Sequence, residues 1–288
     1  MELSEMVSEA RSILHELEDG ADELTAKFGT ESSDRDCASL WALWNACRIY
    51  DDDVVALCSA GRYWSALAIL RALIDGTAKF SYLLSSLDRK ERERRFSCFC
   101  EYEREKDVGS IEQPAKKLVE DGEYGDGDRA EFAKGHLIKQ IDAEKTPCGF
   151  GKRNRDASNE LSYKSITGKI AEEFPIWKMF KTHMDDRRAR ANGFSHLNYL
   201  ACEDVVRTEL GKIENPAQDV EACMAIHLTE VCVLKRIRGE ALLHAVGISD
   251  RRYCEIMKRH KHFWSACTAL ADDKVDQVVA KSAMEDDK

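Results

Sequence analysis

The sequence has little proline and none of the long apolar runs that cross membranes. Four prolines occur in 288 residues, and helix interiors tolerate few prolines. No apolar run approaches the ~20 residues that a membrane-spanning helix needs, and the acidic start MELSEMVSEA is unlike a signal peptide. The eleven cysteines form no CxxC pair and no dense cluster, which argues against a disulfide framework or a zinc site. We therefore expect an all-α cytoplasmic protein with free thiols.

The motifs of the common cofactor and metal enzymes are also missing. The sequence contains no Walker A motif, no GxGxxG in a βαβ unit and no HExxH, and the carboxylates of "YDDDVV" (50–55) would point in different directions on a helix. The other histidines (His15, His136, His183, His227 and His244) are expected to be packed or solvated. A net charge of −10 disfavours a protein that coats nucleic acid as a whole. We expect no cofactor and no metal.

Apolar residues instead recur at steps of three and four along most of the chain, which indicates amphipathic helices. The stretch 62–87 is hydrophobic nearly all round and should lie at the centre of a bundle. The glycine-rich and acidic stretches between about 108 and 160 read as a polar loop insertion. The expected organisation is an N-terminal amphipathic helix (1–30), a helical bundle core (31–247) and a basic C-terminal helix with an acidic tail (248–288).

Within the apolar stretch 62–87, Arg71 and Asp75 are four residues apart and share a helix face. Two charges in such surroundings are expected to be paired, because isolated buried charges are costly. One interpretation is an ion pair inside the bundle. The other is that Asp75 or Arg71 orients a histidine in a catalytic site. The two interpretations are compatible.

The stretch "RRARANGFSHLNYL" (187–200) is the main candidate for chemistry. His196 could act as an acid or base near neutral pH, and Arg190 could stabilise charge on a phosphate. On an unbroken helix these two residues would be ~120° and ~9 Å apart, and Arg188 would be ~12 Å from His196 along the axis. Convergence needs a second subunit, a long reach by the arginine, or a helix break, for which Asn192-Gly193 with Ser195 as the next N-cap is suited. The alternative is a polar turn between two helices.

The stretch "RRYCEIMKRHKHFW" (251–264) mixes cations with aromatic residues, a combination that can contact nucleic acid. A solvated charged helix face is the alternative, since the chain as a whole is acidic. The candidate nucleic-acid-binding residues are Arg251, Arg252, Lys258, Arg259 and Lys261.

Two segments carry a resemblance. "GRYWSALAILRALIDGTAKFSYLL" (61–84), with Arg71 and Asp75, and "FSHLNYL" (194–200) resemble a broad, poorly characterised bacterial helical family with an R-x3-D/E helix and a later Ser-His element. Arg190-x5-His196 is more distantly similar to the R-x(4–6)-H motif of the HEPN superfamily (higher eukaryotes and prokaryotes nucleotide-binding). In that motif a polar residue usually follows the arginine, whereas Ala191 follows here and Asn192 comes one place later.

The resemblance implies a HEPN-like helical bundle, a homodimer and metal-independent endoribonuclease activity, in a toxin–antitoxin or phage-defence setting with a partner protein. His196 would be the catalytic acid or base, and Arg190, with Arg188 as a substitute, would contact the phosphate of RNA. Two alternatives stay open at this point. One is a non-catalytic helical interaction or regulatory subunit, and the other is an RNA-binding module that does not cleave.

Overall fold

The computed structural model describes residues 1–100, 102, 159–195 and 216–270. Every regular element in these ranges is helical, which confirms the all-α class. Residues 89–100 and 261–270 are also helical. The helices with defined bounds are α1 (Leu3–Glu18), α2 (Ala21–Glu31), α3 (Asp34–Ser59), α4 (Tyr63–Ser85), α9 (Tyr163–Glu173), α10 (Pro175–Ser195), α12 (Pro216–Ala245) and α13 (Arg252–Arg259).

The chain divides into two units, one formed by Met1–Arg89 with Ile166–Lys288 and the other by Lys90–Ser165. In the second unit, Arg94 contacts both Glu91 and Glu160. The hydrogen bond from Arg94 lowers the pKa of the Glu91 carboxyl to about 2. The polar insertion that the sequence predicts near 108–160 lies almost wholly outside the described residues, and every candidate site residue belongs to the first unit.

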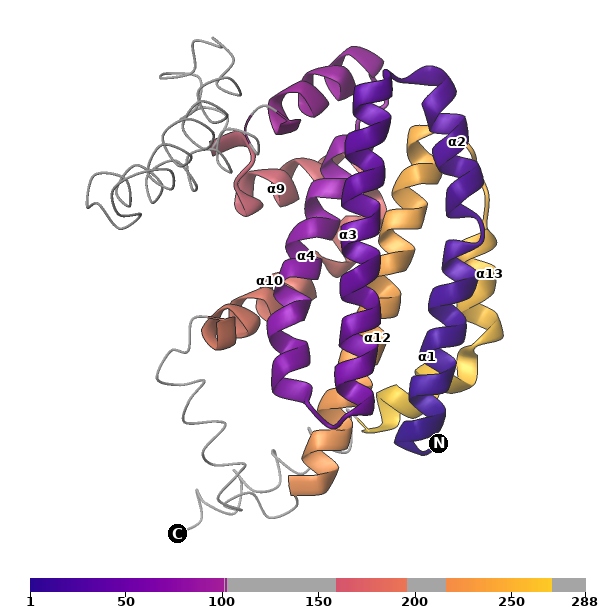
Figure 1. The fold of residues 1–288 in the computed structure, drawn as a ribbon, viewed down its shortest axis with the longest axis vertical. Helices are drawn as coiled ribbons and strands as arrows, with labels where there is room; N and C mark the ends of the chain where they lie inside the picture. The colour runs from indigo at the N-terminus through magenta and orange to yellow at the C-terminus, as the bar shows by residue number, and fades with distance from the viewer. Residues whose placement is uncertain (101, 103–158, 196–215, 271–288) are drawn as a thin grey trace, which may run out of the picture. The chain divides into compact units, whose positions relative to one another are not determined.

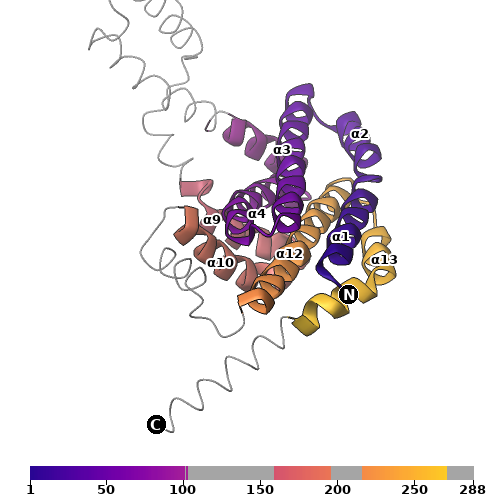
Figure 2. The same cartoon turned by 60° about the horizontal axis from the view of Figure 1, so that its bottom comes forward.

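Helix α4 lies at the centre of the first unit, as its apolar sequence predicts. It packs against α3, α10 and α12, and its buried residues include Leu70, Leu73, Ile74 and Phe80. Helix α12 in turn contacts α1, α2, α3 and α13. The two views agree that α10 lies on one side of α12 while α1 and α13 lie on the other (Figures 1 and 2). The two sides of α12 therefore face different helices.

Several helix ends follow the sequence signals. The Ser33 side chain accepts a hydrogen bond from the Asp36 backbone N–H at the start of α3, and Gly61 and Gly247 adopt positive φ angles of 71° and 65° after α3 and α12. Glycine closes helices in this way because it has no Cβ to strain. No helix in the described ranges combines the length and the hydropathy that a membrane crossing requires.

The N-terminal helix is divided, contrary to the single amphipathic helix expected over residues 1–30. Helix α1 ends at Glu18 and α2 begins at Ala21. The apolar positions on both sides of the division are buried, from Leu17 to Leu24, so the periodicity continues across it. A Cβ on Gly20 would lie 2.5 Å from Nη1 of Arg252. A larger residue at this position would require the end of the Arg252 side chain to move, a close approach that periodicity does not show.

A charged pair crosses the core between α12 and α3. Arg238 and Asp51 are 1% and 0% exposed, and an Arg238 Nη donates to Asp51 Oδ2 at 2.5 Å. The other Nη donates to Thr77 of α4 at 2.8 Å, and the guanidinium lies 5.8 Å from the Trp44 ring centroid. Asp51, the first carboxylate of the acidic run 51–53, is thus a buried partner of an arginine.

Candidate active site on helix α10

Helix α10 buries one face and presents the other to its surroundings. Trp177, Met184 and Ala191 are 0%, 1% and 0% exposed and recur every seven residues, which places them on one side of the helix. This helix packs against α4. The arginines of "RRARANGFS" are arranged around that buried face, so each one meets a different environment.

The expected break at Asn192-Gly193 is wrong, because α10 continues through both residues and ends at Ser195. Ser195 is therefore the last residue of this helix instead of the N-cap of another. Glycine in a helix interior costs about 1 kcal/mol relative to alanine, and burial of a helix face commonly outweighs such a preference. The buried Ala191 directly before this pair shows that packing of α10 extends to its last turns.

Arg188 is held by Asp75. Its Nε donates to Asp75 Oδ1 at 2.5 Å, and the two side chains are 28% and 30% exposed. This ion pair ties α10 to the central helix α4. Arg71 is half-buried one turn earlier on α4. The arginine that the structure places on Asp75 thus comes from 113 residues away, a pairing that helical spacing within α4 could not predict.

Arg187 points toward α12 and joins a cluster around Glu230. Its Nε lies 2.5 Å from Glu230 Oε1, and its Nη2 lies 3.1 Å from Glu230 Oε2 and 2.9 Å from His227 Nδ1. His183 Nε2 lies 3.0 Å from Glu230 Oε1. Glu230 and His227 are only 3% and 2% exposed, whereas His183 is 51% exposed. We call these four residues the Glu230 cluster.

Electrostatics keep the buried Glu230 ionised. Burial opposes its ionisation, but the positive charge of Arg187 and the contacts with His183 and His227 outweigh burial and lower the pKa of this carboxyl well below its usual range. A guanidinium can only donate hydrogen bonds, so His227 Nδ1 accepts from Arg187 and the ring proton lies on Nε2. That Nε2 atom is buried and has no hydrogen-bond partner among the described residues.

Arg190 differs from its neighbours because it faces solvent. Its side chain is 65% exposed, and its Nε lies 3.1 Å from Asp186 Oδ2, one turn earlier on the same helix. Asp186 is itself 57% exposed, and exposed pairs of this kind contribute only about 0.3–0.5 kcal/mol. The arginine of the R-x5-H pattern is therefore readily available to an external anion, unlike Arg187 and Arg188.

Of two further residues of the pattern, the structure describes Asn192 but not His196. Asn192 is half-buried near the end of α10. His196 lies outside the described residues, one position beyond the end of the helix at Ser195, so its convergence with Arg190 stays a prediction.

The basic stretch 251–264 is largely engaged with acidic side chains of the protein itself. Arg252 pairs with Asp250, and Lys258 pairs with Glu255. Arg259 contacts Glu16 of α1, while Arg251 and Lys261 are exposed. These contacts with the protein's own acids favour the alternative of a charged helix face over that of a nucleic-acid surface.

The sequence interpretation missed the Glu230 cluster. His183 and Arg187 are four residues apart on α10, and His227 and Glu230 are three apart on α12, so each half shows the spacing of helical neighbours. Each of these two spacings can be seen in the sequence of its own helix. What the spacing could not show is that these two faces point at each other, because the halves are separated by about 40 residues of sequence.

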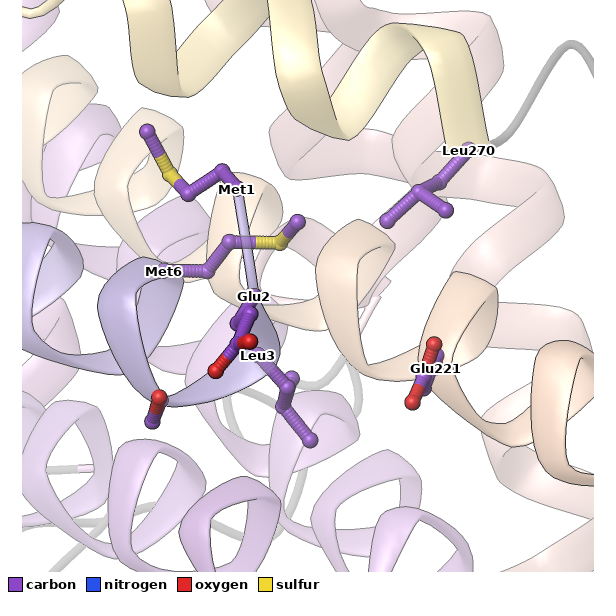
Figure 3. Close-up of a pocket in the computed structure, with 7 residues that line it drawn as sticks. Met1, Glu2, Leu3, Met6, Glu221 and Leu270 are labelled. Atoms are coloured by element: carbon purple, nitrogen blue, oxygen red, sulfur yellow. The ribbon is translucent and has the colours of Figure 1, made fainter.

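A pocket of about 470 Å³ lies elsewhere, at the start of α1 (Figure 3). Apolar side chains and two carboxylates line it, from Met1, Glu2, Leu3, Met6, Glu221 and Leu270. None of the candidate residues borders it, and its carboxylates would repel a phosphate. Within the described ranges, no group of three or more His, Cys, Asp or Glu side chains is placed to hold a metal.

Comparison with protein-family models, with curated proteins and with solved structures finds no match for this chain. The interpretation of its site therefore depends on the geometry of α10 and on the chemistry of its side chains.

Proposed function

We propose that this protein is a HEPN-like, metal-independent endoribonuclease whose site lies at the C-terminal end of α10. The exposure of Arg190 is the observation that carries this proposal. Arg187 and Arg188 are bound to Glu230 and Asp75, while Arg190 is 65% exposed and held only across one turn by the exposed Asp186. The one arginine of this trio that belongs to the R-x5-H pattern is the one presented to solvent.

In the proposed reaction, His196 removes the proton of a ribose 2′-hydroxyl and the resulting oxygen attacks the adjacent phosphorus. The bond from phosphorus to the 5′-oxygen breaks, which leaves a 2′,3′-cyclic phosphate and a 5′-hydroxyl. The guanidinium of Arg190 stabilises the charge that grows on the phosphate oxygens. No metal takes part in any of these steps. Asp75 supports the site indirectly, since it holds Arg188 and thereby fixes α10.

A homodimer is part of the same proposal. Symmetry could bring two such helix ends to one cleft, which would allow Arg190 of one subunit to serve with His196 of the other. A toxin or phage-defence role, with a partner protein that restrains the activity, belongs to the proposal as well. Sedimentation analysis together with mixing of singly inactivated variants, one changed at Arg190 and one at His196, tests whether the site is shared.

The decisive experiment is a cleavage assay on a mixed-sequence RNA in the presence of EDTA. We expect wild-type protein to produce 2′,3′-cyclic phosphate ends and to leave the all-deoxy version of the substrate intact. Arg190→Ala and His196→Ala should each lower the rate by roughly 10²-fold or more, with helicity and melting unchanged. Arg11→Ala removes an exposed cation of α1 and is the matched control, with a rate near wild type.

Two outcomes would contradict the proposal. One is full activity in both the Arg190 and the His196 variants. The other is an inert wild-type protein, which would favour the alternative of a non-catalytic helical interaction module. RNA binding without cleavage, with an affinity that falls steeply as salt rises and depends on Arg251 and Lys261, would favour the third alternative.

A further inference from the structure

His183 is placed on α10 so that one ring nitrogen is fixed by the protein. Its Nε2 meets Glu230 Oε1 at 3.0 Å, and Glu230 is fixed in turn by Arg187, which contacts both carboxylate oxygens. No described residue forms a hydrogen bond with His183 Nδ1, and the side chain is 51% exposed. A carboxylate that orients an imidazole and stabilises its protonated form is a recurrent arrangement for acid–base catalysis.

His183 is the only member of the Glu230 cluster that can exchange protons with a bound molecule. His227 is 2% exposed, and its Nδ1 accepts from Arg187. Arg187 remains protonated at all ordinary pH values, and Glu230 is buried and strongly stabilised as the anion. The cluster therefore presents a single titratable group to solvent, with a buried negative charge behind it.

Helix geometry places His183 on the same side of α10 as Arg190. Residues seven apart are offset by about 20° around the axis and by about 10 Å along it. Both side chains are more than half exposed. The Arg190 side chain extends one turn back along α10, where its Nε lies 3.1 Å from Asp186 Oδ2, so an RNA phosphate on its guanidinium would lie between Arg190 and His183, with its 5′-oxygen toward the histidine.

The proposed cleavage requires two proton transfers. One proton leaves the 2′-oxygen, and another must reach the 5′-oxygen as its bond to phosphorus breaks. We infer that His183 is the general acid of this site, which donates a proton from its exposed ring nitrogen to the departing 5′-oxygen of RNA. This inference rests on the proposed function. The electron pair of the broken P–O5′ bond takes up that proton, and the base that removed the 2′-proton returns it to His183 through water.

Replacement of the 5′-bridging oxygen by sulfur tests this role directly. A thiolate leaves without protonation, so a 5′-phosphorothiolate RNA does not need the acid. We expect His183→Gln, which keeps a donor for Glu230, to slow cleavage of ordinary RNA by roughly 10²-fold or more. The same variant should cleave the sulfur-substituted RNA within about tenfold of the wild-type rate. Arg190→Ala should slow both substrates.

The matched control is His15→Gln. His15 is also a histidine one turn from an acid, Asp19, but it lies on α1 and is 80% exposed, so both substrates should react at wild-type rates. A second measurement needs no variant. The limb of the wild-type pH–rate profile that reports the acid should be present with ordinary RNA and absent with the sulfur-substituted RNA.

Three results would overturn the inference. Wild-type rates in His183→Gln on ordinary RNA, with cleavage by the wild type intact, would remove His183 alone and leave the proposed function standing. Equal slowing of both substrates would show that His183 only supports the fold. An inert wild-type protein with both substrates would overturn the proposed function and this inference together.

Discussion

Two histidines of this molecule are held by glutamates in opposite ways. His183 meets the buried Glu230 through Nε2 alone. His260, which follows α13, meets two glutamates of α1, with Nδ1 2.6 Å from Glu9 and Nε2 2.7 Å from Glu16. A neutral imidazole carries only one N–H, so donation to both carboxylates requires the protonated ring. His260 therefore fastens two helices together, whereas His183 keeps one nitrogen for other partners.

The two regions also differ in which partner is buried. In the Glu230 cluster the carboxylate is buried and its histidine is half exposed. In the contact between α13 and α1 the histidine is nearly buried, while Glu9 and Glu16 are 36% and 29% exposed. Loss of a partner is costly where it strands a buried charge. The comparison teaches that a ring engaged through one nitrogen and open to solvent, like that of His183, can meet an external molecule, whereas a ring held between two carboxylates serves as a contact between helices.

The largest expected effect comes from removal of the buried charge. Glu230→Gln leaves the guanidinium of Arg187 without its anion, and the free energy of unfolding should fall by about 3–5 kcal/mol. Glu255→Gln is the control, because Glu255 is exposed and pairs with the exposed Lys258, so its loss should change stability far less. Urea denaturation of both variants measures the difference. Equal, small losses would show that the Glu230 cluster does not anchor α10.

Packing against α12, as well as charge, should attach α13 to the rest of the unit. A Cβ on Gly239 would lie 2.4 Å from the Tyr253 ring, and Tyr253 is 1% exposed. Gly239→Ala should therefore push α13 away from α12 and lower stability by about 1–3 kcal/mol. Gly168→Ala meets no atom within 4 Å and should be neutral or stabilising. Urea denaturation and protease cleavage near Tyr253 report the change. Unchanged protection would mean that the ionic contacts alone hold α13.

The sequence predicted the helices of this fold far better than the contacts between them. The apolar periodicity located α4 at the centre of the bundle. It could not show that Arg188 reaches Asp75, or that Asp51 is a buried partner of Arg238, because such pairs depend on how separate helices face each other. For the site, the pattern singled out Arg190 from local spacing, but it missed Glu230, whose role depends on a second helix.

The third prediction concerns pH and applies to the contact between α13 and α1. Burial lowers the pKa of His260, but the hydrogen bonds to Glu9 and Glu16 outweigh burial and raise it above its ordinary value of 6.5. The stabilisation is therefore fully present below pH 6.5 and is lost as the pH rises through the raised pKa. The stability difference between wild type and His260→Gln should shrink from pH 6 to pH 9, measured by urea denaturation at each pH.

The control for this titration is His15→Gln, which removes an 80% exposed histidine from the same helix α1. Arg259 also contacts Glu16 and keeps its charge throughout this range, so part of the attachment persists at high pH. A difference between wild type and His260→Gln that stays constant from pH 6 to pH 9 would contradict the protonated ring.

The smallest effect on stability, and a specific one on function, is expected from Asp186→Asn. Asp186 and Arg190 form an exposed pair one turn apart, so its loss should change the free energy of unfolding by only about 0.3–0.5 kcal/mol. In the proposed complex with RNA, the same carboxylate would compete with a phosphate for Arg190. Its removal should tighten RNA binding about fivefold, which corresponds to ~1 kcal/mol, measured with a non-cleavable 2′-deoxy analogue at low salt. Asp185→Asn removes an equal charge that pairs with Lys181 instead, and it should change binding less. Equal gains in both variants would mean that net charge, and not release of Arg190, governs the affinity.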